Sequence, residues 1–77
     1  MEGAEITMKG TITRVFLPRG FGFARGDDGL DYFIQADALV DVAWDGVIIR
    51  EGVRVEFLPD ANGAGGNGLR ATEVRLA

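Results

Sequence analysis

The chain has 77 residues, of which 47% are apolar and 26% charged, and it contains neither cysteine nor histidine. This composition is typical of one small globular domain, and it excludes both a disulfide framework and a Cys/His zinc site. The net charge of −4 argues against strong nonspecific binding to nucleic acid.

The charges are distributed unevenly along the chain. Residues 6–26 carry four basic side chains and no acid, whereas residues 27–45 carry six aspartates and no base. One basic surface on an acidic body is therefore compatible with the net charge. No apolar run is long enough to span a membrane, and the first ten residues lack the basic-then-apolar order of a signal peptide. We expect a soluble cytoplasmic protein.

Short apolar or alternating runs, separated by Gly, Pro, Asp and Asn, predict an all-β domain. The expected strands are residues 8–17, 20–25, 31–35, 53–58 and 69–76. The fourth strand alternates, so Val55 and Phe57 should face inward and Arg54 outward. The apolar positions of the fifth strand change parity between Ala71 and Val74, which predicts a β-bulge there.

Residues 36–52 form one long connection, in which Asp37 is expected to cap a single helical turn. Five short strands with one long connection favour a closed five-stranded antiparallel barrel, because closure removes exposed strand edges. We expect the whole chain, residues 1–77, to form one domain with its core at about 8–76.

The stretch RGFGFARGDDGLDYFIQ contains three phenylalanines whose orientation depends on one turn. A two-residue loop would pair Phe23 with Ile34 and bury the rings. A three-residue loop at 27–29 pairs Phe23 with Phe33 and turns the rings outward, with Gly29 at the left-handed position that such loops favour. A face that mixes phenylalanine with polar groups favours the three-residue loop and an exposed stacking surface. Burial of the rings is the alternative.

The segments KGTITRVFLPRGFGFA, DYFIQADAL, REGVRVEF and LRATEVRL together resemble the cold-shock domain, a five-stranded OB-type barrel. RGFGFA is similar to the first ribonucleoprotein motif of that family, and YFIQADAL is similar to the second. The resemblance implies a protein that binds single-stranded RNA or DNA, as an RNA chaperone or a regulator of transcription or translation does. It implies base stacking on Phe21, Phe23 and Phe33.

Further binding residues follow from the same resemblance. Trp44 falls near a stacking aromatic of the family's long loop, and Phe16 is the one ring near the place of a missing first-strand tryptophan. Gln35 replaces the family's histidine and is expected to hydrogen-bond a base edge or a sugar. The phosphate contacts are expected from the basic strip, which comprises Lys9, Arg14, Arg19 and Arg25.

The chain also departs from the family pattern. Where the family usually reads FVHFS, this chain reads FIQAD, so a histidine and a phenylalanine are absent. Each stacked base contributes ~1–3 kcal/mol, so we expect weaker binding than in members with the full motif. The sequence does not separate RNA from DNA, because stacking serves both.

A second hypothesis treats the barrel as a protein-interaction module. The apolar segment Val40–Ile49, which contains Trp44, would then contact a partner or cap the core.

The aspartates do not fit the spacing of a calcium-binding EF-hand and are expected to serve turns and caps. GAGGNG at 63–68 matches a dinucleotide-binding pattern, but it lacks the preceding strand and the following helix, so a hairpin loop is expected. No residue grouping supports catalysis or a cofactor.

Overall fold

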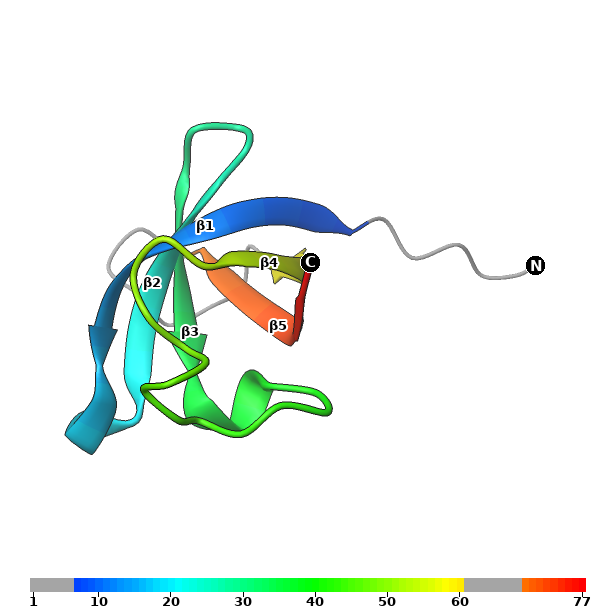
Figure 1. Ribbon diagram of the computed structural model, residues 1–77. Coiled ribbons are helices and arrows are strands. Elements are labelled where there is room, and N and C mark those ends of the chain that lie inside the picture. The colour runs from blue at the N-terminus through cyan, green and yellow to red at the C-terminus, as the bar shows by residue number, and fades with distance from the viewer. Residues whose placement is uncertain (1–6, 61–68) are drawn as a thin grey trace.

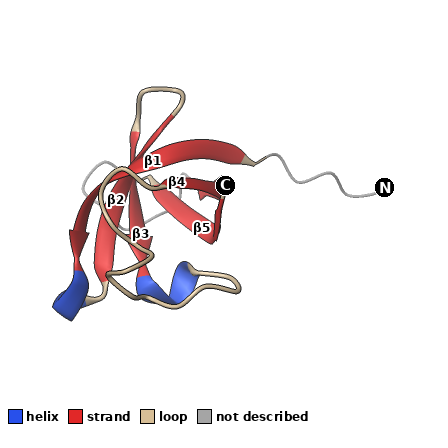
Figure 2. Ribbon diagram, in the orientation of Figure 1, coloured by secondary structure: helices blue, strands red, loops and turns tan. Residues whose placement is uncertain are grey.

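The computed structural model describes residues 7–60 and 69–77, and in these residues five strands form a closed barrel (Figure 1). The strands are β1 (Met8–Phe16), β2 (Phe21–Gly26), β3 (Asp31–Gln35), β4 (Arg54–Asp60) and β5 (Arg70–Leu76). Two single-turn 3-10 helices, η1 (Leu17–Arg19) and η2 (Ala36–Ala38), lie at the same end of the barrel (Figure 2). The all-β prediction is confirmed.

The strands follow the order β1, β2, β3, β5, β4 around the barrel, and β4 pairs back onto β1. The expectation of a wholly antiparallel barrel is wrong, because β3 and β5 are parallel, with Phe33 opposite Arg70. The reason is geometric. Strands that alternate in direction around a closed ring must be even in number, so a ring of five contains a parallel pair.

Strand β1 joins the two halves of the barrel. It pairs with β2 and with β4, and Gly10 lies opposite both Gly26 and Val55. The register between β1 and β2 shifts between Ile12 and Arg14, and β1 is strongly curved (Figure 1). Such a shift inserts an extra residue into one strand and bends it. The bend brings β1 across β2 at close range.

The core lies inside the barrel and is formed from all five strands and the long connection. The residues of this core are Ile12, Ala24, Tyr32, Ile34, Ile49, Val55, Phe57, Ala71 and Val74. Ile49 comes from the long connection, whose end is held to β1 by hydrogen bonds from the Ile12 amide to the Val53 carbonyl (2.9 Å) and from the Gly52 amide to the Ile12 carbonyl (2.8 Å).

The predicted patterns of β4 and β5 are confirmed. Val55 and Phe57 are buried and Arg54 is exposed. In β5, Ala71 and Val74 are both buried although they are three positions apart, because the register with β4 shifts by one residue between them. Glu73, at the shift, has a φ of 48°. Because of this bulge, the side chains of both Ala71 and Val74 face the core.

Two smaller expectations have different outcomes. Asp37 was expected to cap a helical turn, but the N-cap of η2 is Gln35 and Asp37 lies inside the turn. A 3-10 turn of three residues begins directly where β3 ends, so no residue separates them. The hairpin loop expected at 63–68 lies outside the described residues. No helix in ranges 7–60 and 69–77 has the length and apolar character needed to cross a membrane.

The turn between β2 and β3 follows the three-residue arrangement. The Gly26 amide donates to the Leu30 carbonyl (2.8 Å), and Gly29 has a φ of 87°. The Asp28 carboxylate accepts hydrogen bonds from the Leu30 amide (3.0 Å) and from the hydroxyl of buried Tyr32 (2.7 Å). The bond to Asp28, together with burial, raises the pKa of Tyr32 to about 12. The bond from Tyr32 also lowers the pKa of Asp28.

We predict that Gly22→Ala destabilises the barrel, because a Cβ at this position would lie 2.5 Å from the Arg14 carbonyl oxygen. Backbone atoms cannot move away cheaply, so the expected loss is about 1–3 kcal/mol in urea unfolding. Gly46→Ala is the matched control, since its Cβ would meet a movable methyl group of Leu17 at 2.9 Å. Equal stability of the Gly22→Ala and wild-type proteins would contradict the close crossing of β1 and β2.

We predict that Tyr32 makes the stability depend on alkaline pH. Folding raises its pKa from 10.0 to about 12, so its contribution is complete below pH 10 and is lost as the pH rises through about 12. Tyr32 is the single tyrosine of the chain, so tyrosinate absorbance reports on it alone. Tyr32→Phe should lose roughly 1 kcal/mol at neutral pH and flatten this part of the pH profile. A midpoint near pH 10 in the folded protein would refute the buried bond to Asp28.

Candidate functional site

Four phenylalanine rings contact one another on the outer face of β1, β2 and β3. We call this group, Phe16, Phe21, Phe23 and Phe33, the aromatic platform. The ring centroids are 4.9 Å apart for Phe16 and Phe21, and 5.6 Å apart for Phe33 with either Phe21 or Phe23. All four residues are partly exposed, and none belongs to the buried core. The rings therefore present a connected apolar surface that is already assembled.

The register of β2 and β3 places these rings outside. Phe23 lies opposite Phe33 and Phe21 opposite Gln35, as the three-residue loop predicts. The alternating residues Gly22, Ala24, Tyr32 and Ile34 are buried. Small residues on the inner side of β2 let the strand lie close over the core, while the bulky rings point away from it.

Cross-strand neighbours arrange the site in two rows. The first row runs across β1, β2, β3 and β5, and consists of Arg14, Phe23, Phe33 and Arg70. The second row runs across β1, β2 and β3, and consists of Phe16, Phe21 and Gln35. The guanidinium carbon of Arg14 lies 5.5 Å from the centroid of the Phe16 ring, within the range of a cation–π contact. The rings thus have a cationic residue on each side.

The other predicted basic residues lie at different distances from the platform. Arg19 is exposed in η1, the turn that joins Phe16 to Phe21. Arg25 is one row beyond Phe23, and its Nε is 3.0 Å from Asp31 Oδ1, so its charge is partly neutralised. Lys9 lies opposite Glu56 on β4. At about 3.3 Å per residue along a strand, Lys9 is roughly 20 Å from the Phe16 end, so the structure does not bring it to the rings.

Trp44 is held against the barrel rather than projecting from it. Its indole nitrogen donates a hydrogen bond to the Leu17 carbonyl in η1 (3.0 Å), and its side chain packs against the core. The ring remains partly exposed. Three roles were weighed from the sequence. Capping the core agrees with this position, whereas stacking on a base and contact with a protein partner stay predictions.

Arg70 was missed in the sequence, although it borders the platform. Its outward orientation was predictable, because it precedes the buried Ala71 on the same strand. The sequence did not indicate which strand lies next to Arg70. The pairing of β3 with β5 places Arg70 beside Phe33, and no local pattern in either segment indicates that these two strands are adjacent.

The aspartates that make the chain acidic have structural partners. Asp27 forms a two-pronged ion pair with Arg54, with N–O distances of 2.9 and 3.0 Å, and this contact lowers the pKa of Asp27. Asp45 accepts a hydrogen bond from the Val47 amide (2.8 Å), as expected of a turn residue. Within the described residues, no group of three or more acidic side chains is arranged to hold a metal ion. The negative charge therefore stabilises turns and ion pairs.

No protein-family model matches this sequence, and a search of curated proteins finds no significant match. The chemistry of the site must therefore be argued from its own geometry. That geometry comprises a connected group of partly exposed rings, tilted 34–90° to one another, with arginines at both edges and one amide side chain.

Proposed function

We propose that this protein binds single-stranded RNA or DNA, without catalysing a reaction, by stacking bases on the aromatic platform. One observation carries the proposal: four phenylalanines in contact remain partly exposed on an outer sheet face, while Phe57, Tyr32 and smaller residues fill the core. Apolar rings outside a core lose the stabilisation of full burial. Stacking on bases compensates for this loss, because every base has a π-face.

The flanking side chains suit the same ligand. Arg14 borders the rings, and Arg19 is exposed in the adjoining turn, so phosphates that follow stacked bases meet positive charge. Gln35 lies opposite Phe21 and is exposed. Its amide group can both donate and accept hydrogen bonds at a base edge. The net charge of −4 leaves stacking as the main contribution to affinity, with a modest salt dependence.

We also propose that the barrel is of the OB type and that the chain is a cold-shock-like protein of the cytoplasm. The resemblance in RGFGFA and YFIQ supports this assignment, and the closed five-stranded barrel is compatible with it. The rings at Phe21, Phe23 and Phe33 lie on the outer face that the resemblance requires. Strand exchange and unfolding of RNA hairpins, the work of an RNA chaperone, follow from sequence-tolerant stacking.

A second candidate is a protein contact at the segment Val40–Ile49. Val47 is 78% exposed there, and Ile48 and the nearby Leu17 are 37% and 39% exposed. Ile49, Val42 and Trp44 of the same segment pack on or in the core, so only its tip is available. Self-association that light scattering detects and that Val47→Ser abolishes would favour this candidate.

We predict that Phe23→Ala weakens binding to a short oligo-dT or oligo-U strand by roughly 5- to 150-fold, because one stacking partner contributes ~1–3 kcal/mol. Fluorescence of Trp44, the single tryptophan, measures the affinity. Leu30→Ala is the matched control: it removes a side chain that is 49% exposed but lies in the turn, away from the rings. It should leave the affinity unchanged.

Thermal unfolding establishes that both variants remain folded. The outer position of Phe23 predicts that its removal leaves the core intact. A folded Phe23→Ala protein with wild-type affinity would refute stacking on the platform.

A further inference from the structure

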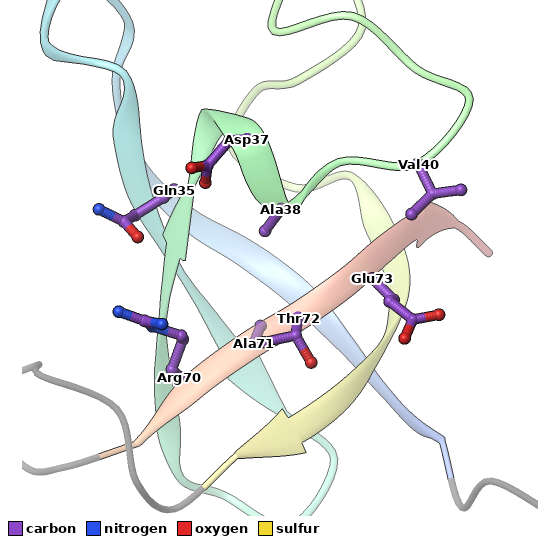
Figure 3. A pocket seen from close by; sticks show the side chains of 8 residues that line it. All are labelled: Gln35, Asp37, Ala38, Val40, Arg70, Ala71, Thr72 and Glu73. Carbon is purple, nitrogen blue, oxygen red and sulfur yellow. The ribbon is translucent and has the colours of Figure 1, made fainter.

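A pocket of about 310 Å³ opens beside the aromatic platform, where β3 and β5 diverge (Figure 3). The two strands pair at Phe33 and Arg70, and Leu39, which follows η2, forms a bridge to Val74 on β5. Between these points η2 lies across the gap and leaves a hollow. Polar side chains that line it include Gln35 and Asp37 on one side, and Arg70, Thr72 and Glu73 on β5. We call it the Arg70 pocket.

Arg70 has an unmet hydrogen-bonding requirement in this pocket. Its Nε is buried and, among the residues that the structure describes, has no hydrogen-bond acceptor. A buried donor without a partner destabilises the folded state. In Figure 3 the guanidinium projects to the same side as the Gln35 amide, from the neighbouring strand. Arg70 as a whole is only partly buried, so a ligand with acceptor atoms can reach the rest of its guanidinium group.

The charges around the pocket determine which ligand fits. Asp37 and Glu73 line it together with Arg70, so two acidic side chains and one basic side chain border the pocket, and the Glu73 carboxylate points away from Arg70 (Figure 3). A phosphate or a free carboxylate would meet this negative excess and be repelled. A neutral ligand that carries acceptors on one edge and donors on another avoids the repulsion and can use both kinds of side chain.

Among the nucleobases, guanine has this arrangement. Its O6 and N7 form an adjacent pair of acceptors that matches the fork of an arginine, and this pairing is the commonest specific contact of arginine with a base. Its N1–H and N2–H₂ groups are adjacent donors, and a carboxylate can accept one hydrogen bond from each with its two oxygens. Adenine offers N7 beside a donor, which suits an amide side chain better than an arginine.

We propose that the Arg70 pocket holds a guanine base of the bound strand, an inference that rests on the nucleic-acid binding proposed above. Arg70 donates to the acceptor edge of the base, and Asp37 accepts from the donor edge. Arg70 lies directly opposite Phe33, so the guanine is the neighbour of the base that stacks on Phe33. The protein therefore prefers strands with guanine at one position and tolerates any base on the rings.

The test is a guanine scan of a short oligo-dT strand. One thymine at a time is replaced by guanine, and the affinity for each strand is measured by Trp44 fluorescence with the full chain. A bidentate arginine–guanine pair discriminates by ~1–3 kcal/mol. The expected result is a gain of roughly 5- to 150-fold at one position of the strand, with no gain from adenine there. Replacement of that guanine by 7-deazaguanine, which lacks the N7 acceptor, should remove most of the gain.

Two variants locate the preference in the pocket. Arg70→Lys keeps the positive charge and loses the fork, so the ratio of its affinities for the guanine-containing strand and for oligo-dT should fall to about one, whatever its affinity for oligo-dT. Arg75→Lys is the matched control on the same strand, because Arg75 is exposed, lies outside the pocket and has only a 3.9 Å ion pair with Asp41. It should keep the preference. Circular dichroism confirms that both variants are folded.

The outcomes separate this inference from the function on which it rests. If oligo-dT binds but no guanine position improves the affinity, or if Arg70→Lys retains the preference, the guanine pocket is wrong while stacking on the platform stands. If no strand binds even at low salt, the nucleic-acid function fails and the guanine pocket fails with it.

Discussion

The hydrogen bond from the Gly26 amide to the Leu30 carbonyl closes a three-residue turn, and the outer face of the barrel depends on this turn. One residue fewer in the loop would pair Phe23 with Ile34 and place Phe33 on the opposite face of the sheet, because side chains alternate along a strand. Gly29 has a φ of 87°, which lies in the left-handed region that glycine adopts without a steric penalty. The hydrogen bonds that the Asp28 carboxylate accepts from Leu30 and Tyr32 stabilise this turn. With this register Phe23 meets Phe33 outside the core.

The position of the rings divides the apolar residues between stability and binding. The buried core contains one phenylalanine, Phe57, and otherwise smaller aliphatic residues, alanine and Tyr32. The platform rings recover part of the stabilisation that full burial would give by packing on one another, since aromatic pairs contribute about 0.5–1.5 kcal/mol beyond area burial. A small domain that keeps four rings partly outside its core has little stability to spare. This division explains why glycine and alanine are needed on the inner side of β2.

Much of the fold was predictable from local patterns, whereas the edges of the site were not. The alternation in β4, the bulge in β5 and the loop glycine all act within a few residues, so the sequence displays them directly. The parallel pairing of β3 with β5 depends on closure of the whole ring, and it alone brings Arg70 to Phe33. The bond of Trp44 to the Leu17 carbonyl spans 27 positions and leaves no local pattern. The candidate binding residues on adjacent strands were therefore found, and the one from β5 was missed.

The central claim is that the face bearing Phe16, Phe21, Phe23 and Phe33 binds a single strand of nucleic acid. An NMR titration of the isotope-labelled protein with oligo-dT, at low and at physiological salt, tests it most directly. The account predicts saturable amide shifts that cluster on β1, β2 and β3 around the rings and spare β4. Shifts confined to the Val40–Ile49 segment, or no shifts at low salt, would contradict it.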